Sequence, residues 1–279
     1  MRIFKLALFV LCFFIAARFA RSQTDGFTWA KVQSDLTFNA DWAVDSPPPA
    51  IFNQKFNYLA KGAQSFVFAS EDGEYVLKFF RHHHMRAPWI IRSLPFAWAK
   101  KTAQKKESKL RKDFLSYKIA IQEMPGETGI VYLHLNKTDH LKKKVTFIDK
   151  IGIAHEISLD GMEFMVQKRA TLLYPAIAQL MEENRAQEAK QAIASLIHLL
   201  QKRCEKGIFD KDPDLNTNFG LAGGMPIQID VGRFRYDKDR ASSAIYKDEI
   251  IRITDHFHQW LMIRYPMLDD YLREKLNEI

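Results

Sequence analysis

One stretch of the chain, residues 207–234, concentrates acidic and amide side chains among turn-forming residues. It reads GIFDKDPDLNTNFGLAGGMPIQIDVGRF and carries four side chains with hard oxygen atoms: Asp210, Asp212, Asn218 and Asp230. Mg²⁺ takes a few such ligands from a protein and the rest from water and substrate phosphates. The stretch therefore predicts a loop and a hairpin that together build a magnesium-phosphate site. The alternative is a solvated loop in which Asp and Asn act as turn and cap residues.

The order of these residues resembles the catalytic centre of the protein-kinase-like superfamily, in its atypical, small-molecule or lipopolysaccharide-kinase-like branches. There a catalytic Asp precedes a metal-binding Asn, and the Asp of a D-F-G motif follows one hairpin later. The sequence Asp230-Val231-Gly232 stands in the place of D-F-G. The resemblance implies that Asn218 and Asp230 ligate Mg²⁺. The spacing from Asp212 to Asn218 is one residue longer than usual, so both Asp212 and Asp210 remain candidates for the catalytic Asp.

A second group of residues lies upstream, in YLAKGAQSFVFASEDGEYVLKFF at residues 58–80. Its apolar runs predict three strands, and Asp72-Gly73 favours a hairpin turn between the last two. By the same resemblance these are the first strands of a kinase N-lobe, with ATP as the cofactor. Gly62 and Ser65 then belong to the turn that covers the nucleotide, and Lys78 pairs with its phosphates. The turn keeps one of the three glycines usual in the family.

Residues 103–124 are predicted to form a helix, because apolar residues recur at steps of three and four. The resemblance implies that an acidic residue of this helix pairs with Lys78. Glu107 is the candidate and Asp113 its rival, although both are also suited to pair with neighbouring lysines on the surface.

The remaining pattern predicts strands near 129–135, 145–148 and 163–167, and then a change to helices at 186–205 and 246–264. Gly207 is placed to cap the first of these helices. We therefore expect an α+β, bilobal protein-kinase-like fold, with an antiparallel-sheet N-lobe over residues 51–170 and a reduced helical C-lobe over 171–279. The short segment after Asp230 leaves little chain for a platform that binds protein substrates.

The N-terminus has the pattern of an export signal. Arg2 and Lys5 precede the uncharged run Leu6–Ala17, and small residues follow near Ser22. Residues 1–22 are predicted to be a signal peptide or an N-terminal membrane anchor, and residues 23–50 a linker or lead-in with a proline run near its end. The expected location is the secretory pathway, the periplasm, the exterior or a membrane.

The chain carries 41 Lys and Arg against 33 Asp and Glu, a net charge of +8. Part of the excess lies in residues 100–112, which form either a solvated face or a surface for an anionic membrane. Residues His82–His84 favour a solvated turn over a metal site, because adjacent histidines point in different directions on a regular element. No motif for binding nucleic acid accompanies the charge.

These observations favour Mg²⁺-ATP-dependent phosphoryl transfer to a hydroxyl group on a small molecule, a glycan or lipid, or a protein. Two alternatives stay open. One is a pseudokinase, which keeps the fold as a binding or regulatory module without catalysis. The other is a membrane-tethered interaction protein that uses its basic face.

Overall fold

The computed structural model describes residues 2–44 and 50–279, so the proline run of residues 47–49 lies outside the described residues. The chain divides into two compact units. Unit 1 comprises Met1–Glu107 and His134–Val166, and unit 2 comprises Ser108–Leu133 and Gln167–Ile279. The division differs from the predicted boundary between residues 170 and 171, because the second half of a long helix and most of one strand belong with the later helices.

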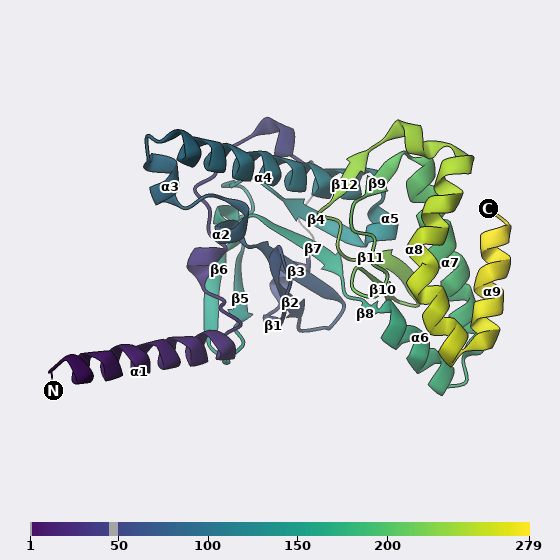
Figure 1. The fold of residues 1–279 in the computed structure, drawn as a ribbon, viewed down its shortest axis with the longest axis horizontal. Helices are drawn as coiled ribbons and strands as arrows, with labels where there is room; N and C mark the ends of the chain where they lie inside the picture. The colour runs from purple at the N-terminus through teal and green to yellow at the C-terminus, as the bar shows by residue number, and fades with distance from the viewer. Residues whose placement is uncertain (1, 45–49) are drawn as a thin grey trace. The chain divides into compact units, whose positions relative to one another are not determined.

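Unit 1 is built on an antiparallel-rich sheet (Figure 1). The strands are β1 (Phe56–Lys61), β2 (Ser65–Ser70), β3 (Tyr75–Phe80), β5 (Lys144–Ile148) and β6 (Ala154–Ser158), and the chain passes between the units within β4 (Ile130–His134) and β7 (Phe164–Lys168). The strand order is β4-β7-β3-β2-β1-β5-β6. The predicted strands at 58–61, 66–69 and 75–80 correspond to β1, β2 and β3. Strand β5 runs parallel to β1, which places the hairpin of β5 and β6 at the far edge.

Aromatic residues fill one face of this sheet and bind the predicted linker to it. Phe68 and Phe79 contact Phe147 at ring-centroid distances of 5.3 and 5.0 Å. Phe27, from the segment before β1, contacts Phe66 at 5.1 Å and is itself buried. Residues 24–44 are therefore packed against unit 1 and are not a free linker. The unit also contains short 3₁₀ helices: η1 (Trp29–Lys31), η2 (Ala40–Trp42), η3 (Ala50–Asn53) and η4 (Leu159–Gly161).

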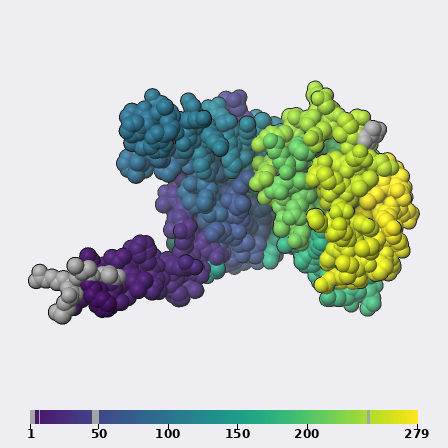
Figure 2. All heavy atoms as spheres, viewed as in Figure 1, coloured from purple at the N-terminus to yellow at the C-terminus, as the bar shows by residue number. Residues whose placement is uncertain are grey.

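The first helix, α1 (Arg2–Gln23), is apolar and uncovered. Large apolar side chains from Phe4 to Phe19 are exposed. For example, 69% of the surface of Phe9 is accessible to solvent. Figure 2 shows the helix in purple with its visible face open to solvent. Within the described residues, none of the helices meets the length and hydropathy expected of a membrane span.

The histidine triplet forms helix α2 (His82–Met85), and a second short helix, α3 (Trp89–Ser93), follows it. The predicted solvated turn is wrong for His82, which is buried beside the buried Glu163 with 3.0 Å between Nε2 and Oε2. Ser34 Oγ donates to the other carboxylate oxygen of Glu163 at 2.6 Å. This polar group ties the lead-in segment, α2 and the approach to β7 together inside unit 1.

Helices form most of unit 2. They are the second half of α4 (Ala97–Glu123), α5 (Pro125–Thr128), α6 (Leu173–Glu182), α7 (Ala186–Glu205), the short 3₁₀ helix η5 (Lys238–Ala241), α8 (Ser243–Arg264) and α9 (Pro266–Asn277). The apolar stripe of α7 is buried in the core of the unit, as its spacing predicts. Gly207 follows α7 with φ +65°, the left-handed conformation that glycine adopts readily.

Five short strands complete unit 2. Strands β8 (Thr171–Leu172), β10 (Phe219–Ala222) and β11 (Met225–Gln228) form one sheet, and β9 (Ile208–Asp210) pairs with β12 (Phe234–Tyr236). The acidic stretch thus begins on one strand, passes through a loop into the hairpin of β10 and β11, and returns beside its start. The predicted α+β class, with an antiparallel-rich sheet in one unit and a helical second unit, is confirmed.

Candidate active site

The loop between β9 and β10 is closed by Asn218. Its side-chain Nδ2 donates to the main-chain oxygen of Asp212 at 2.6 Å. Its own main-chain oxygen accepts a hydrogen bond from Ile229 N at 2.8 Å. Asn218 therefore fixes Asp212 on one side and the segment leading to Asp230 on the other, so that unit 2 brings together the three residues implied by the resemblance.

Asp210 is buried and held by several partners. Its Oδ1 accepts from Asp212 N at 3.0 Å, and its Oδ2 accepts from Gln228 Nε2 at 2.5 Å. Arg203, which is 1% exposed, donates to Gln228 Oε1 at 2.8 Å and lies 3.8 Å from the same carboxylate. Burial raises the pKa of Asp210, against the attraction of Arg203. A carboxylate enclosed in this way positions the loop and has no open face for a substrate.

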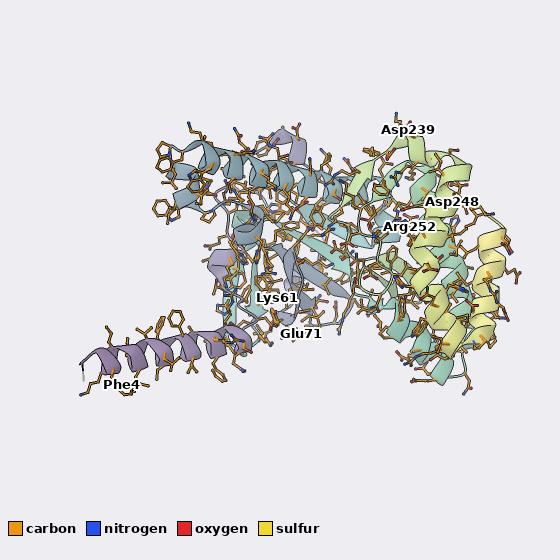
Figure 3. All side chains as sticks on the ribbon, in the orientation of Figure 1. Phe4, Lys61, Glu71, Asp239, Asp248 and Arg252 are labelled. Carbon is orange, nitrogen blue, oxygen red and sulfur yellow. The ribbon has the colours of Figure 1, made fainter. Side chains whose placement is uncertain are left out.

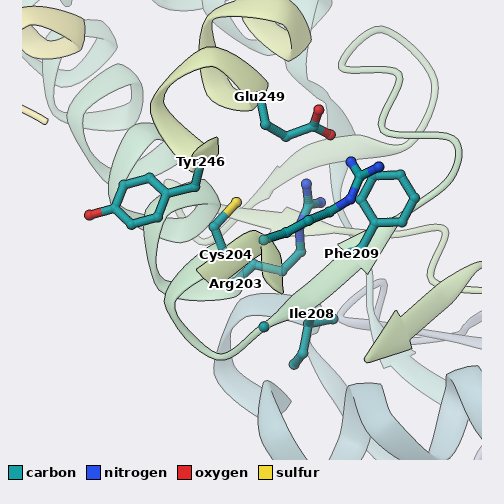
Figure 4. Close-up of a pocket in the computed structure, with 8 residues that line it drawn as sticks. Arg203, Cys204, Ile208, Phe209, Tyr246 and Glu249 are labelled. Atoms are coloured by element: carbon teal, nitrogen blue, oxygen red, sulfur yellow. The ribbon is translucent and has the colours of Figure 1, made fainter. Parts of the chain in front are cut away.

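Arg203 is one of the side chains that line a small pocket (Figure 4). Its neighbours Cys204, Phe209, Tyr246 and Glu249 line a pocket of about 10 Å³, the lower limit for one water molecule. This pocket is too small for a nucleotide or an acceptor.

Asp212 is exposed, in contrast to Asp210. Its carboxylate oxygen Oδ2 lies 3.1 Å from Arg233 Nη1, and both side chains are 53% accessible to solvent. An exposed ion pair of this kind contributes about 0–1 kcal/mol to stability. Asp212 is thus the accessible carboxylate of the loop.

Asp230 follows β11 at the start of a tight turn. Its Oδ1 accepts from Gly232 N at 3.1 Å, and its main-chain oxygen accepts from Gln228 Nε2 at 3.2 Å. The buried hydroxyl of Ser116, from α4, donates to Val231 O and accepts from Phe234 N at 2.5 Å. Side chains on both sides of the turn therefore fix its backbone, while the Asp230 carboxylate stays exposed.

The donor set of unit 2 fits Mg²⁺. Asn218 uses its nitrogen on Asp212, which leaves Oδ1, at 3.1 Å from Thr217 Oγ1, as its ligand atom. Asp230 supplies a carboxylate. Across residues 2–44 and 50–279, no group of three or more His, Cys, Asp or Glu is arranged to hold a metal ion. One amide oxygen and one carboxylate suit Mg²⁺, which usually keeps several waters and phosphate oxygens among its ligands.

Unit 1 contains the residues predicted to hold the nucleotide. Gly62 and Ser65 close the turn between β1 and β2, with 2.8 Å from Gly62 N to Ser65 O. Arg81 Nη1 donates to Gly62 O at 2.7 Å. A Cβ built on Gly62 would lie 3.5 Å from Ser65 O, an ordinary contact, so the turn itself does not require glycine. Lys78 is half-buried in β3, opposite Val67 of β2.

The two acidic candidates of α4 differ in burial. Glu107 is exposed, and its charge raises the pKa of Arg86 against the effect of burial. Asp113 is 3% exposed, with Lys109 Nζ at 3.6 Å, and burial raises its pKa. Of the two, Asp113 has the burial expected of a partner inside a site.

Sequence reasoning missed the residues that position this site, namely Arg203, Gln228 and Ser116. Gln228 is a polar residue between Ile227 and Ile229, and it is the one sequence feature that points to a buried network. Arg203 and Ser116 lie at buried positions of amphipathic helices, where nothing in the spacing separates them from surface residues.

A groove borders the loop on the surface of unit 2. It is a largely open hollow with a volume of about 700 Å³, lined by side chains of three elements: Tyr174, Pro175 and Ala178 of α6, Asp214 and Asn216 of the loop, and His256, Trp260 and Arg264 of α8. Tyr174 packs on Trp260 with 4.7 Å between ring centroids. Asp214 Oδ2 accepts from Thr217 Oγ1 at 3.0 Å, which ties this wall to the loop that Asn218 closes. The groove combines an aromatic floor with hydrogen-bonding groups.

No protein-family model matches the chain, and no curated protein sequence matches it. It is similar to a crystal structure of the bifunctional kinase-methyltransferase WbdD, with 14% identity, a TM-score of 0.36, and coverage of 77% of this chain and 43% of that one. A structure of WbdD with a kinase inhibitor gives 11% identity, coverage of 79% and 45%, and a TM-score of 0.38. The Rv3197–erythromycin complex from Mycobacterium tuberculosis gives 14% identity, coverage of 66% of this chain and 47% of that one, and a TM-score of 0.32.

This chain spans less than half the length of those solved chains. TM-scores at this level place no residue of the site. The resemblance to the kinase-like fold is carried by the order of elements within each unit: three antiparallel strands with Lys78 on the third, and an Asp–Asn loop followed by a hairpin and Asp230-Val231-Gly232. Within each unit, the order of these elements is similar to the order in a kinase-like fold.

Proposed function

We propose that this chain is a Mg²⁺-ATP-dependent phosphotransferase that acts on a hydroxyl group. The observation that supports this most is the double role of Asn218, which binds Asp212 through its side chain and Ile229 through its main chain. An ordinary solvated loop is not joined to the next hairpin by a buried amide side chain. The arrangement leaves two carboxylates, Asp212 and Asp230, exposed at the ends of fixed segments.

Each residue has a distinct role in this proposal. Lys78 holds nucleotide phosphates, and Gly62 and Ser65 form the turn over them. Asn218 and Asp230 hold Mg²⁺, which neutralises charge on the phosphates when it is bound. Asp212 orients the acceptor hydroxyl and takes its proton, and Asp210 positions Asp212 by accepting from its main-chain nitrogen. Most of the rate enhancement in such chemistry comes from positioning and electrostatics.

The groove beside the loop supports a small acceptor. Its volume lies within the usual range for small-molecule sites, which runs from about 300 to about 1,000 Å³. Trp260 offers an apolar surface, and Asp214 and Asn216 extend hydrogen-bonding groups from the loop that carries Asp212. We therefore favour a small molecule or a glycan terminus as the acceptor over an extended protein segment.

The test is transfer of the γ-phosphate of labelled ATP to a panel of small hydroxyl compounds by the full chain, with Mg²⁺ and with a chelator. We expect Asp212→Asn to lower transfer at least about a hundredfold and Asp230→Asn to abolish it. Asp248→Asn removes the same charge from the exposed face of α8 (Figure 3) and serves as the matched control, which keeps full activity. Equal transfer by Asp230→Asn and the control contradicts the proposal.

A pseudokinase is the second candidate, and the ion pair between Arg233 and Asp212 favours it. A guanidinium on this carboxylate competes with an acceptor hydroxyl for the same oxygen. The pseudokinase predicts nucleotide-dependent stabilisation without transfer to any acceptor. It also predicts that the parent chain has no transfer activity and that Arg233→Ala gains it. The phosphotransferase proposal predicts activity in the parent chain.

A further inference from the structure

A group of basic side chains gathers in unit 1 where α1 meets the sheet, and we call it the basic cluster. Its members come from separate elements: Arg21 of α1, Lys31 of η1, Lys61 of β1, Arg81 after β3, His83 and His84 of α2, and Lys106 of α4. No part of the phosphotransferase proposal uses these side chains, so the cluster needs its own explanation.

Direct contacts hold the cluster together. Arg81 Nη2 donates to His84 Nε2 at 2.5 Å, and Lys106 Nζ donates to the main-chain oxygen of His84 at 2.6 Å. His83 Nδ1 lies 3.4 Å from Lys31 O, and Lys31 Nζ donates to Gly26 O. Basic groups from α2, α4 and the lead-in segment are therefore neighbours in the folded unit.

Arg81 is the buried centre of the cluster. It is 8% exposed, and its guanidinium carbon lies 5.1 Å from the centre of the Phe66 ring. Its Nη1 is used on Gly62 O, but its Nε has no hydrogen-bond partner among the described residues. A buried N–H without an acceptor costs about 1–3 kcal/mol, and an anionic oxygen is the partner that a guanidinium binds most strongly.

The cations of the cluster repel one another. Burial lowers the pKa of Lys31, and the nearby charges of Arg21, Arg81 and Lys61 lower it further. Asp25, the carboxylate that acts on Lys61, is already engaged by Lys150 Nζ at 2.8 Å and Tyr58 Oη at 3.0 Å. Cations that repel one another in this way are stabilised by a bound anion, and arginine favours phosphate because its planar fork matches the oxygen geometry.

The apolar surface of α1 adjoins the cluster. Arg21 lies in the last turn of α1, and its side chain is close enough to Lys31 that a Cβ on Gly26 would touch both, at 3.3 and 3.4 Å. The exposed apolar side chains begin within the preceding turn and continue to Phe4, which points away from the helix (Figure 3). A basic group at the end of an apolar helix is the combination that binds acyl chains and anionic headgroups together.

We propose that the basic cluster binds the phosphate of an anionic lipid headgroup while α1 contacts the acyl region of the same membrane. A free phosphate ion offers the same oxygen atoms to Arg81, but it leaves the exposed apolar surface of α1 without a partner. The cluster adjoins the turn assigned to the nucleotide, because Arg81 donates to Gly62 O. The variants that test the cluster nevertheless change none of the residues assigned to the nucleotide, the metal or the acceptor.

The test compares binding of the full chain to vesicles of phosphatidylcholine with and without phosphatidylglycerol, by co-sedimentation. The cluster variant is Arg21→Gln/Lys31→Gln/Lys61→Gln. The matched control is Lys100→Gln/Lys101→Gln/Lys105→Gln, which removes the same charge from exposed positions of α4 and keeps α1 intact. Since each basic residue at a membrane surface contributes about 1 kcal/mol, we expect the cluster variant to bind anionic vesicles about 100-fold more weakly and the control to bind nearly as the parent does.

Three outcomes overturn the proposal. Equal binding to neutral and anionic vesicles assigns the interaction to α1 alone, and an equal loss in both triple variants assigns it to net charge. The third is competition by inorganic phosphate at low millimolar concentration, together with no preference for anionic vesicles, which assigns the site to free phosphate. If the triple variant fails to fold, Lys61→Gln alone is the replacement, because Lys61 is exposed at the end of β1 (Figure 3) and its loss is expected to weaken anionic binding about fivefold.

Discussion

Gln228 Nε2 lies 2.5 Å from Asp210 Oδ2, inside unit 2 and away from solvent. The same nitrogen lies 3.2 Å from the main-chain oxygen of Asp230. One buried amide thus links the start of the acidic loop to the turn that carries the proposed metal ligand. The site is held by this amide more than by any contact between the charged residues themselves.

Replacing Gln228 by methionine tests this link. The change keeps the side-chain volume nearly constant but leaves Asp210 and Arg203 each without a buried hydrogen bond. Each unsatisfied group costs about 1–3 kcal/mol, so we expect a clear fall in the free energy of unfolding, measured with urea. Gln191→Met, at an exposed position of α7, is the control and is expected to change it by less than about 0.5 kcal/mol. Equal midpoints for the two variants rule the link out.

Asp210 and Asp212 are expected to separate into a structural and a catalytic residue. Asp210→Ala removes one partner of a buried pair with Arg203 and should cost about 3–5 kcal/mol of stability. Asp212→Asn changes an exposed side chain, so stability should stay within about 0.5 kcal/mol. Phosphoryl transfer by Asp212→Asn should fall by about a hundredfold to ten-thousandfold, the usual contribution of a general base. Unfolding and turnover measured on both variants decide the assignment, and a stable, inactive Asp210→Ala reverses it.

Gly220 is expected to tolerate no side chain. A Cβ at this position would lie 2.5 Å from Thr171 O, where β10 passes β8, so backbone must move. Overpacking of this kind costs about 1–3 kcal/mol, and the shift reaches Asn218 two residues earlier. Gly220→Ala should therefore lower the unfolding temperature and the stabilisation by Mg²⁺-ATP together. Gly126→Ala is the control, because no atom lies within 4 Å of its Cβ position. Matching unfolding temperatures for the two variants contradict the close approach.

Glu163 is expected to make stability depend on pH in the acid range. Burial opposes ionisation of this carboxyl, but hydrogen bonds from His82 and Ser34 outweigh burial and lower its pKa below the usual 4.5. A carboxyl with a lowered folded-state pKa stabilises the fold fully above its unfolded value, and the contribution is lost as the pH falls through the folded value. The difference in unfolding free energy between the parent and Glu163→Gln should shrink as the pH falls below about 4.5. A difference that stays constant over this range excludes the effect.

Local pattern was enough to predict some of the strands and the longer helices of this protein, but not the short helix α2 at the histidine triplet. Asp72-Gly73 favours a tight turn, and the apolar run before Lys78 favours a strand. The hairpin of β2 and β3 therefore follows from residues close in sequence. The same holds for α7 and its glycine cap. The hairpin of β5 and β6 was only half predicted, because β6 alternates exposed and half-buried residues and carries no strong apolar signature.

Local sequence pattern predicts only part of the candidate site. The spacing of Asp212, Asn218 and Asp230 follows from the sequence because one loop and one hairpin contain all three. The difference between Asp210 and Asp212 does not, because it depends on Arg203 and Gln228, which reach Asp210 from other elements. The burial of Asp113 rather than Glu107 likewise depends on how α4 is packed. The spacing of its apolar residues does not determine which of the two acidic residues is buried.

The parallel pairing of β1 with β5 determines when unit 1 can fold. Phe56 lies opposite Phe147, so the edge of β1 stays unpaired until the later strand has left the ribosome. At synthesis rates of about 5–20 residues per second, that delay lasts on the order of 5 to 20 seconds. For that period the nascent chain presents an open strand edge beside unburied phenylalanines, a state that chaperones bind and that aggregates when they are absent.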